Sequence, residues 1–168
     1  KNGYFLTCHH CVNPLGDLLL LDNHGKVIEI EGVCLQDETT DIALVKAKIA
    51  GPREIIKYKY AQYLDTNEQI AILSRWMGKF SVTCGFVKYG ICREKETGRF
   101  SLAVSQISKK GDSGGVVANM RGEILSIHKS ASEITNTSPG APTGPASISV
   151  PFFYITEFLE KNLFLREV

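Results

Sequence analysis

The pattern with the clearest chemical content is Gly111-Asp112-Ser113-Gly114-Gly115, in which glycines enclose a serine. Glycine has no Cβ atom, so it permits a tight turn whose backbone amides approach a reacting group closely. In such a turn Ser113 could act as a nucleophile, and the amides of Gly111 and Ser113 could form an oxyanion hole. Clusters of Gly, Asp and Ser also mark ordinary turns, so the motif is a hypothesis that its context must support.

A serine nucleophile requires a base, and the base requires a carboxylate that orients it. The segment Tyr4–Val12 reads as an apolar strand that runs into a turn carrying His10. The segment Thr40–Val45 places Asp41 at the start of a second apolar strand, where a carboxylate needs hydrogen bonds such as those from an imidazole. His10 alone could cap a turn, and Asp41 alone could open a strand. Together with Ser113, in the order His, Asp, Ser, they predict a catalytic triad.

Three phrases in the chain resemble the signatures of the chymotrypsin-fold serine proteases. They are Thr7-Cys8-His9-His10-Cys11-Val12, Asp41-Ile42-Ala43-Leu44 and Gly111-Asp112-Ser113-Gly114-Gly115. The resemblance implies a serine endopeptidase without a cofactor or metal, in which His10 is the general base, Asp41 orients it and Ser113 is the nucleophile. It extends over nearly the whole chain. The spacing is tighter than in digestive trypsin-like enzymes and is similar to compact bacterial HtrA-type or viral members.

The sequence after Ser113 resembles one branch of this family more closely. A strand at Val116–Ala118, a turn at Met120–Glu123 and a returning strand end in Ile127-His128-Lys129-Ser130. The 3C-like proteases of positive-strand RNA viruses carry a histidine in similar phrases, and a small hydroxyl residue five before the nucleophile, where Ser108 stands. Arterivirus, astrovirus and sobemovirus proteases use serine, whereas the similar potyvirus proteases use cysteine. This resemblance implies processing of a viral polyprotein in the host cell cytoplasm.

His128 and Ser108 together predict a pocket that reads glutamate or glutamine. An imidazole N–H and a hydroxyl can both donate to a carboxylate or amide oxygen, and a substrate without that oxygen leaves them unpaired. A protease that cleaves after Lys or Arg would place an acidic residue six before the nucleophile, where this chain has Ile107. Glutamate is slightly preferred because the serine-nucleophile relatives favour it. The alternative reading is that His128 is a hydrogen-bonded core histidine.

The same strand is the predicted binding edge for an extended substrate. A peptide that adds a strand along Ser126–Ser130 would contact Ser126, Lys129 and Ser130. The Lys109-Lys110 pair beside the oxyanion turn could favour acidic substrate residues, but solvated surface charge is the simpler reading.

Short apolar or alternating runs separated by turn residues predict an all-β fold. The resemblance implies two six-stranded antiparallel β-barrels of chymotrypsin type. We assign residues 1–60 to an N-terminal barrel with His10 and Asp41, 61–150 to a C-terminal barrel with Ser113 and the pocket, and 151–168 to a helix and tail. Residues 139–145 are rich in Gly and Pro and predict a surface loop. Apolar residues at helical spacing predict a helix over Phe153–Phe164. The predicted strands are Tyr4–Cys8, Asp17–Leu21, Lys26–Glu31, Asp41–Val45, Gln69–Leu73, Phe80–Val87, Phe100–Val104, Val116–Ala118, Glu123–His128 and Ser147–Val150.

Composition excludes several other classes. The 168 residues carry a net charge of +1, so the chain has no overall attraction for nucleic acid, and no apolar run approaches transmembrane length. Five cysteines cannot all pair, which favours reduced thiols. Cys8-His9-His10-Cys11 has the spacing of zinc ligands, but Cys34, Cys84, Cys92 and His24 form no second close pair. A structural zinc site is therefore disfavoured, although adventitious inhibition by zinc would be unsurprising.

Three alternatives remain open. A cellular HtrA-type protease would use the same chemistry and cleave after Val or Ala. A catalytically impaired, protease-like binding module is favoured by the short segment before His10, where the family normally has one or two further strands. Either the sequence is a piece of a longer polyprotein or its N-terminal barrel is incomplete. A secondary RNA-binding role could use basic residues that otherwise read as a solvated face: Lys46, Lys48, Arg53, Lys57 and Lys59.

Overall fold

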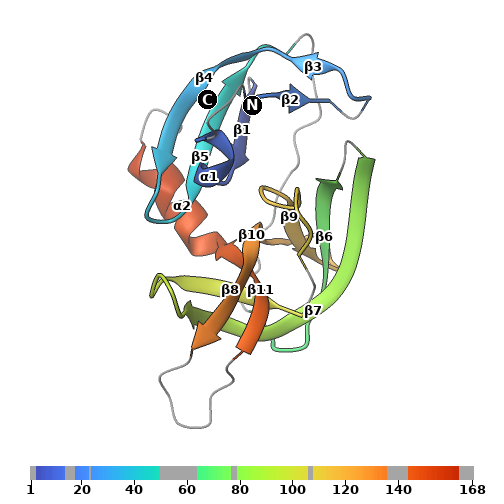
Figure 1. The fold of residues 1–168 in the computed structure, drawn as a ribbon, viewed down its shortest axis with the longest axis vertical. Helices are drawn as coiled ribbons and strands as arrows, with labels where there is room; N and C mark the ends of the chain where they lie inside the picture. Colours follow the sequence, from blue (N-terminus) through green and yellow to red (C-terminus); the bar gives the residue numbers. More distant parts are fainter. Residues whose placement is uncertain are drawn as a thin grey trace.

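The computed structural model describes residues 3–13, 18–22, 24–49, 64–76, 79–105, 108–135 and 144–162. These residues are mostly in antiparallel β-strands, with a short helix near the N-terminus and a longer one near the C-terminus (Figure 1). The helices are α1 (His9–Val12) and α2 (Phe152–Lys161). The strands are β1 (Tyr4–Thr7), β2 (Leu20–Leu21), β3 (Val27–Ile28), β4 (Ile30–Asp37), β5 (Ile42–Ala47), β6 (Gln69–Trp76), β7 (Lys79–Glu94), β8 (Phe100–Val104), β9 (Val116–Asn119), β10 (Ile124–Thr135) and β11 (Gly144–Pro151).

The N-terminal strands form an open sheet with the order β1-β5-β4, accompanied by the β2–β3 pair. Strand β5 lies in the middle because its apolar run, Ile42–Val45, is buried and pairs on both sides. The predicted pair of six-stranded barrels is therefore not confirmed. In the described part of the chain the N-terminal half is an open sheet, because β1 and β4 are paired only with β5.

The C-terminal strands form a closed barrel with the order β10-β11-β8-β7-β6-β9. The ring closes where β9 pairs with β10. The 16-residue strand β7 pairs with β6 in its first part and with β8 and β10 in its later part. A register shift between Val87 and Gly90 bends the strand at this point. The interior is a cluster of buried aliphatic side chains from five strands: Ile70, Ile72, Val87, Leu102, Val104, Val117 and Leu125.

Helix α2 joins the sheet to the barrel. It begins after Pro151, which cannot continue a strand ladder but is suited to a helix start, and it buries Ile155 and Phe158. These two side chains pack in one cluster with β5, through Ile42 and Leu44, and with Ile127 of β10. Burial of each contributes roughly 1.5–3 kcal/mol. Figure 1 shows α2 running from the barrel toward β4 and β5, so the helix fixes the two halves relative to each other.

The prediction of an all-β chain with a C-terminal helix is confirmed, and most predicted strands overlap an observed one. Several strands are longer than predicted, most clearly β4, β7 and β10. β4 continues to Asp37 and β7 to Glu94, over segments in which exposed side chains alternate with half-buried or buried ones rather than forming an apolar run, and β10 continues to Thr135. Residues 139–143 of the predicted loop and residues 50–63, which include the predicted boundary between the barrels, lie outside the described residues. The domain boundaries remain a prediction.

Candidate active site

The buried Asp41 and the exposed His10 form a pair at the start of β5, the central strand of the N-terminal sheet. Asp41 lies in the turn before β5 with a positive φ of 61°, and its side chain is 6% exposed. Its Oδ2 lies 2.9 Å from His10 Nδ1, and its Oδ1 accepts a 3.0 Å hydrogen bond from the His10 backbone amide. The His9 amide donates to the Asp41 carbonyl over 3.1 Å. Asp41 therefore holds both the imidazole, through Nδ1, and the start of α1.

The pairing shifts both ionisation equilibria toward the charged forms. Burial acts to raise the pKa of the Asp41 carboxyl, but the hydrogen bonds from the His10 side chain and amide outweigh it, and the pKa lies below its usual value. The hydrogen bond to Asp41, assisted by Cys11, raises the pKa of His10 to about 10. This pKa favours the imidazolium, the form that follows proton transfer, and only the deprotonated fraction of His10, which grows as the pH rises, can accept a proton.

Ser113 lies in a turn whose glycines are required by its geometry. Gly111 and Gly114 have φ values of 101° and 83°. A Cβ on Gly114 would lie 2.5 Å from Thr7 Oγ1 of β1, so this glycine lets the serine turn approach the N-terminal sheet. Asp112 anchors the turn, because its carboxylate accepts hydrogen bonds from Ser74 Oγ (2.7 Å) and the Lys109 amide (2.8 Å).

The predicted oxyanion-hole amides are not used by the fold. Among the described residues, neither the Gly111 amide nor the Ser113 amide donates a hydrogen bond. Their neighbours are engaged, since the Asp112 amide donates to the Lys109 carbonyl and the Gly115 amide to the Asp112 carbonyl. Two unused amides in a glycine turn are suited to bind a negatively charged oxygen.

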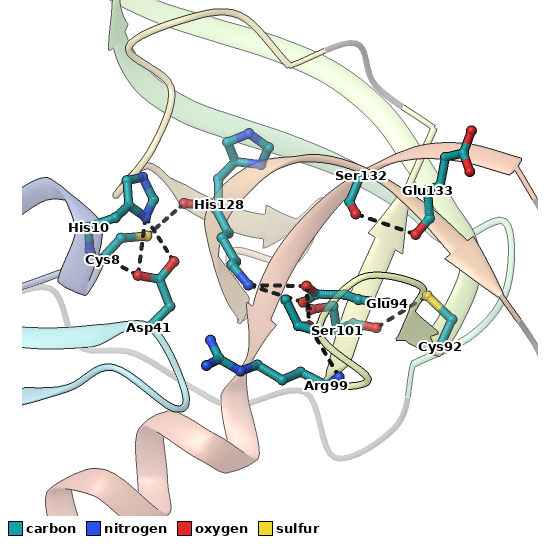
Figure 2. A network of polar contacts seen from close by, with 12 residues as sticks. Cys8, His10, Asp41, Cys92, Glu94, Arg99, Ser101, His128, Ser132 and Glu133 are labelled. Atoms are coloured by element: carbon teal, nitrogen blue, oxygen red, sulfur yellow. Dashed lines mark hydrogen bonds and ion pairs between the residues drawn. The ribbon is translucent and has the colours of Figure 1, made fainter.

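One carbonyl connects the histidine segment to the serine segment. The His128 carbonyl accepts a hydrogen bond from the Gly114 amide (2.9 Å) and another from the Cys8 thiol (3.2 Å). Gly114 follows the serine, and Cys8 lies two residues before His10, so both halves of the predicted triad meet at β10. Figure 2 shows Cys8, His10 and Asp41 together at one end of this network.

The Ser113 hydroxyl is directed to a different partner from the one predicted. It donates to the Lys129 carbonyl over 2.7 Å. No hydrogen bond joins Ser113 to His10 in the described part of the chain. Hydrogen bonds between catalytic groups often reach their final length only when substrate binds.

His128 is fully buried and has serine hydroxyls at both ring nitrogens. Nε2 lies 2.8 Å from Ser108 Oγ, and Nδ1 lies 3.5 Å from Ser149 Oγ. Burial lowers the pKa of His128, so the neutral imidazole is favoured. The two residues predicted to read the substrate are therefore in contact with each other. Ser149 was not predicted as a site residue, because only the pairing of β10 with β11 places it opposite His128.

The predicted binding edge is partly occupied. The His128 amide donates to the Gly115 carbonyl over 2.7 Å, so this part of β10 already has a partner on the serine side. The buried Ser126 Oγ has no hydrogen-bond partner among the described residues. A register shift follows at Lys129, and Ser130 is half-buried beyond it.

Lys129 directs its side chain away from the serine, toward a buried glutamate. Its Nζ lies 3.1 Å and 3.3 Å from the two carboxylate oxygens of Glu94, at the end of β7. Ser101 Oγ and Thr97 Oγ1 also donate to this carboxylate. Burial acts to raise the pKa of Glu94, but these hydrogen bonds and the lysine lower it. The ammonium is thus not available to a substrate, and sequence reasoning missed Glu94 because it lies outside every motif.

All five cysteines are free thiols, and two of them lie beside His10. A hydrogen bond with Cys8 lowers the pKa of Cys11 to about 5, opposed by burial and assisted by His10. The same hydrogen bond and burial raise the pKa of Cys8. One sulfur atom or ring nitrogen from each of Cys8, His10 and Cys11 lies within 4.8 Å of the others.

The described residues include two of the five basic candidates for RNA binding, Lys46 and Lys48. Lys46 lies over the Tyr4 ring at 4.4 Å, and Lys48 pairs with Glu29 at 2.5 Å. The other basic candidates for RNA binding, Arg53, Lys57 and Lys59, lie outside the described residues, as does Ile107. Within the described ranges, no helix has both the length and the apolar character to cross a membrane.

Comparison with known proteins gives two distant similarities. No protein-family model matches the chain. It is 26% identical to serine endoprotease DegS of Salmonella typhimurium over 165 residues, which are 96% of this chain and 45% of that protein. It is 24% identical to anti-sigma-I factor RsgI9 of Acetivibrio thermocellus over 160 residues, 95% of this chain and 21% of that protein. The chain spans less than half the length of these curated relatives. The similarity to DegS is consistent with a trypsin-like protease fold.

Proposed function

We propose that this chain is a serine endopeptidase with His10, Asp41 and Ser113 as its catalytic residues. The observation that carries the proposal is the meeting of the two segments at the His128 carbonyl, which contacts Cys8 on one side and Gly114 on the other. The distant similarity to a serine endoprotease supports the same chemistry. The substrate is a polypeptide.

In the proposed mechanism, rotation about χ1 moves the Ser113 hydroxyl from the Lys129 carbonyl to His10 Nε2. His10 takes the hydroxyl proton as Ser113 Oγ bonds to the substrate carbonyl carbon, and Asp41 stabilises the imidazolium. The Gly111 and Ser113 amides bind the oxyanion. The tetrahedral intermediate then loses its amine, which takes the proton from His10, and leaves an acyl-enzyme. Water repeats the same steps, which releases the acid and restores Ser113.

We propose that the enzyme cleaves after glutamate or glutamine. If Ser149 donates to His128 Nδ1, Nε2 carries the hydrogen and points it toward Ser108. A substrate oxygen can then replace Ser108 as the acceptor, while the Ser108 hydroxyl turns to donate to the same oxygen. The resemblance of the His128 phrase to 3C-like proteases is the support for a viral polyprotein as substrate and for the host cytoplasm as location.

A cellular HtrA-type protease is the second candidate, and the similarity to DegS favours it. The two candidates share the catalytic steps and differ in the residue before the cleaved bond. Cleavage after Val or Ala would support the HtrA-type assignment, because small apolar side chains make no use of His128 and Ser108.

A peptide library tests these proposals together. We expect cleavage after Glu or Gln by the wild type and loss of selectivity in His128→Leu. Ser113→Ala should lose kcat by roughly 10⁴- to 10⁶-fold, as when a triad member is removed. Ser132→Ala, on the same strand but outside the predicted binding edge, is the matched control and should retain selectivity. Turnover retained by Ser113→Ala would reject the nucleophile. Peptide binding without turnover in the wild type would instead support a protease-like binding module.

A further inference from the structure

Three metal-binding side chains lie together beside the proposed base. Cys8, His10 and Cys11 each offer one donor atom within 4.8 Å of the other two. They come from one short segment, the residue before α1 and two residues inside it, so no distant part of the chain must move to bring them together. Cys8 is buried, whereas His10 and Cys11 are partly exposed, which leaves an entry path for an ion.

Their chemistry is that of a zinc site. Two thiolates and an imidazole are preferred ligands of Zn²⁺, with Zn–S and Zn–N distances of about 2.3 and 2.0–2.1 Å. Tetrahedral ligands at these distances are roughly 3.5–3.8 Å apart. The three donor atoms lie within 4.8 Å of one another, so a movement of at most about 1 Å brings each pair to the separation that zinc requires. Rotation of the Cys11 side chain, on a four-residue helix at the surface, can supply such a movement.

We propose that Cys8, His10 and Cys11 bind one Zn²⁺ ion, reversibly, and that the bound ion switches the protease off. Binding forms two Zn–S bonds and one Zn–N bond and releases to solvent every proton that the two thiols and the binding ring nitrogen carry. The inhibitory consequence depends on the proposed function, whereas the binding does not.

Inhibition follows whichever ring nitrogen binds the ion. If Nδ1 binds, His10 loses its 2.9 Å contact with Asp41, and the imidazole is no longer oriented. If Nε2 binds, Asp41 stays in place as the partner of Nδ1, a common arrangement around zinc, but the nitrogen that should accept the serine proton is occupied. A histidine cannot hold the ion and act as a general base in the same turnover.

The number of ligands indicates an exchangeable ion. Structural zinc sites are closed by four protein ligands, whereas three ligands leave a position for water. The other three cysteines lie elsewhere: Cys34 and Cys84 are exposed, and the Cys92 thiol donates to the Ser101 carbonyl. In the described part of the chain, no further His, Cys, Asp or Glu completes the group.

Binding can be measured without proteolysis. Cd²⁺ is added to the metal-free, reduced Ser113→Ala chain, and the thiolate-to-metal charge-transfer absorbance is followed, with Zn²⁺ as the competitor. We expect one Cd²⁺ per chain, displaced by Zn²⁺, and loss of most of the signal in Cys11→Ser. Cys34→Ser is the matched control and should retain the full signal. A signal unchanged in Cys11→Ser, or lost in Cys34→Ser, would overturn the site.

Inhibition is then measured on the active chain with a fluorogenic peptide. Zn²⁺ should inhibit the wild type and Cys34→Ser to the same extent, and a chelator should restore both. Cys11→Ser, compared with its own metal-free activity, should need at least tenfold more Zn²⁺. Metal binding without inhibition would reject the switch but keep the site. An inactive metal-free chain that still binds Cd²⁺ would reject the proposed function rather than the metal site.

Discussion

The buried ion pair between Glu94 and Lys129 permits the most quantitative prediction. Their side chains are 3% and 13% exposed, and the closest distance between charged atoms is 3.1 Å. Replacing Glu94 by glutamine preserves its shape but removes the carboxylate charge that contacts the Lys129 ammonium. At an effective dielectric constant near 20, the lost attraction is about 5 kcal/mol.

The expected loss of stability is smaller than this attraction. Removal of one partner from a buried pair typically costs about 3–5 kcal/mol. Because Lys129 is not completely buried, its ammonium can regain some water, so we expect Glu94→Gln to lower the free energy of unfolding by about 3 kcal/mol. Lys129→Met should cost less, because Glu94 keeps the hydroxyl donors Ser101 and Thr97.

Urea unfolding followed by circular dichroism measures these changes, and the double variant Glu94→Gln/Lys129→Met isolates the pair. The double variant should be more stable than Glu94→Gln alone, since no unpaired charge remains. The control is the exposed pair of Lys95 and Glu133, which are 3.0 Å apart with side chains 59% and 60% exposed. Glu133→Gln should cost at most about 1 kcal/mol. Equal effects of Glu94→Gln and Glu133→Gln, or additive effects in the double variant, would refute the reasoning.

Three further predictions concern the site. Gly114→Ala should destabilise the chain more than Gly122→Ala in urea unfolding, because both glycines have positive φ but only a Cβ on Gly114 meets another residue; equal losses would contradict the close approach. Burial lowers the pKa of His128 below the value of about 6.5 expected in the unfolded chain, so the unfolded chain binds more protons between these pKa values. Stability should therefore fall as the pH drops below about 6.5, and His128→Leu should weaken this dependence. An unchanged pH dependence of stability in His128→Leu would contradict the effect of burial. Cys11 helps to raise the pKa of His10, so Cys11→Ser should move the acidic limb of the pH profile of kcat/KM to lower pH in metal-free buffer. An acidic limb at the same pH in both proteins would show that Cys11 does not influence the ionisation of His10.

Local patterns in the sequence were sufficient for the class of fold. Apolar runs interrupted by Gly, Pro and Asn predict strands and turns, because these structures depend largely on residues adjacent in the sequence. The spacing of Ile155 and Phe158 likewise predicted the C-terminal helix. Motif chemistry also selected His10, Asp41 and Ser113, and their roles remain predictions. The continuations of β4 and β7 were missed because their alternating side chains depend on the neighbouring strands for stability.

The remaining features depend on contacts between distant segments. Pairing of β10 with β11 brings Ser149 to His128. At the register shift after His128, the Lys129 carbonyl accepts the Ser113 hydroxyl and the Lys129 ammonium reaches Glu94. No local pattern encodes these partners, because each results from packing that closes the barrel. The sequence by itself therefore determined which residues are chemically equipped to react. Only the tertiary structure decided which groups they face, since a side chain's partners are set by the approach of strands that are far apart in the chain.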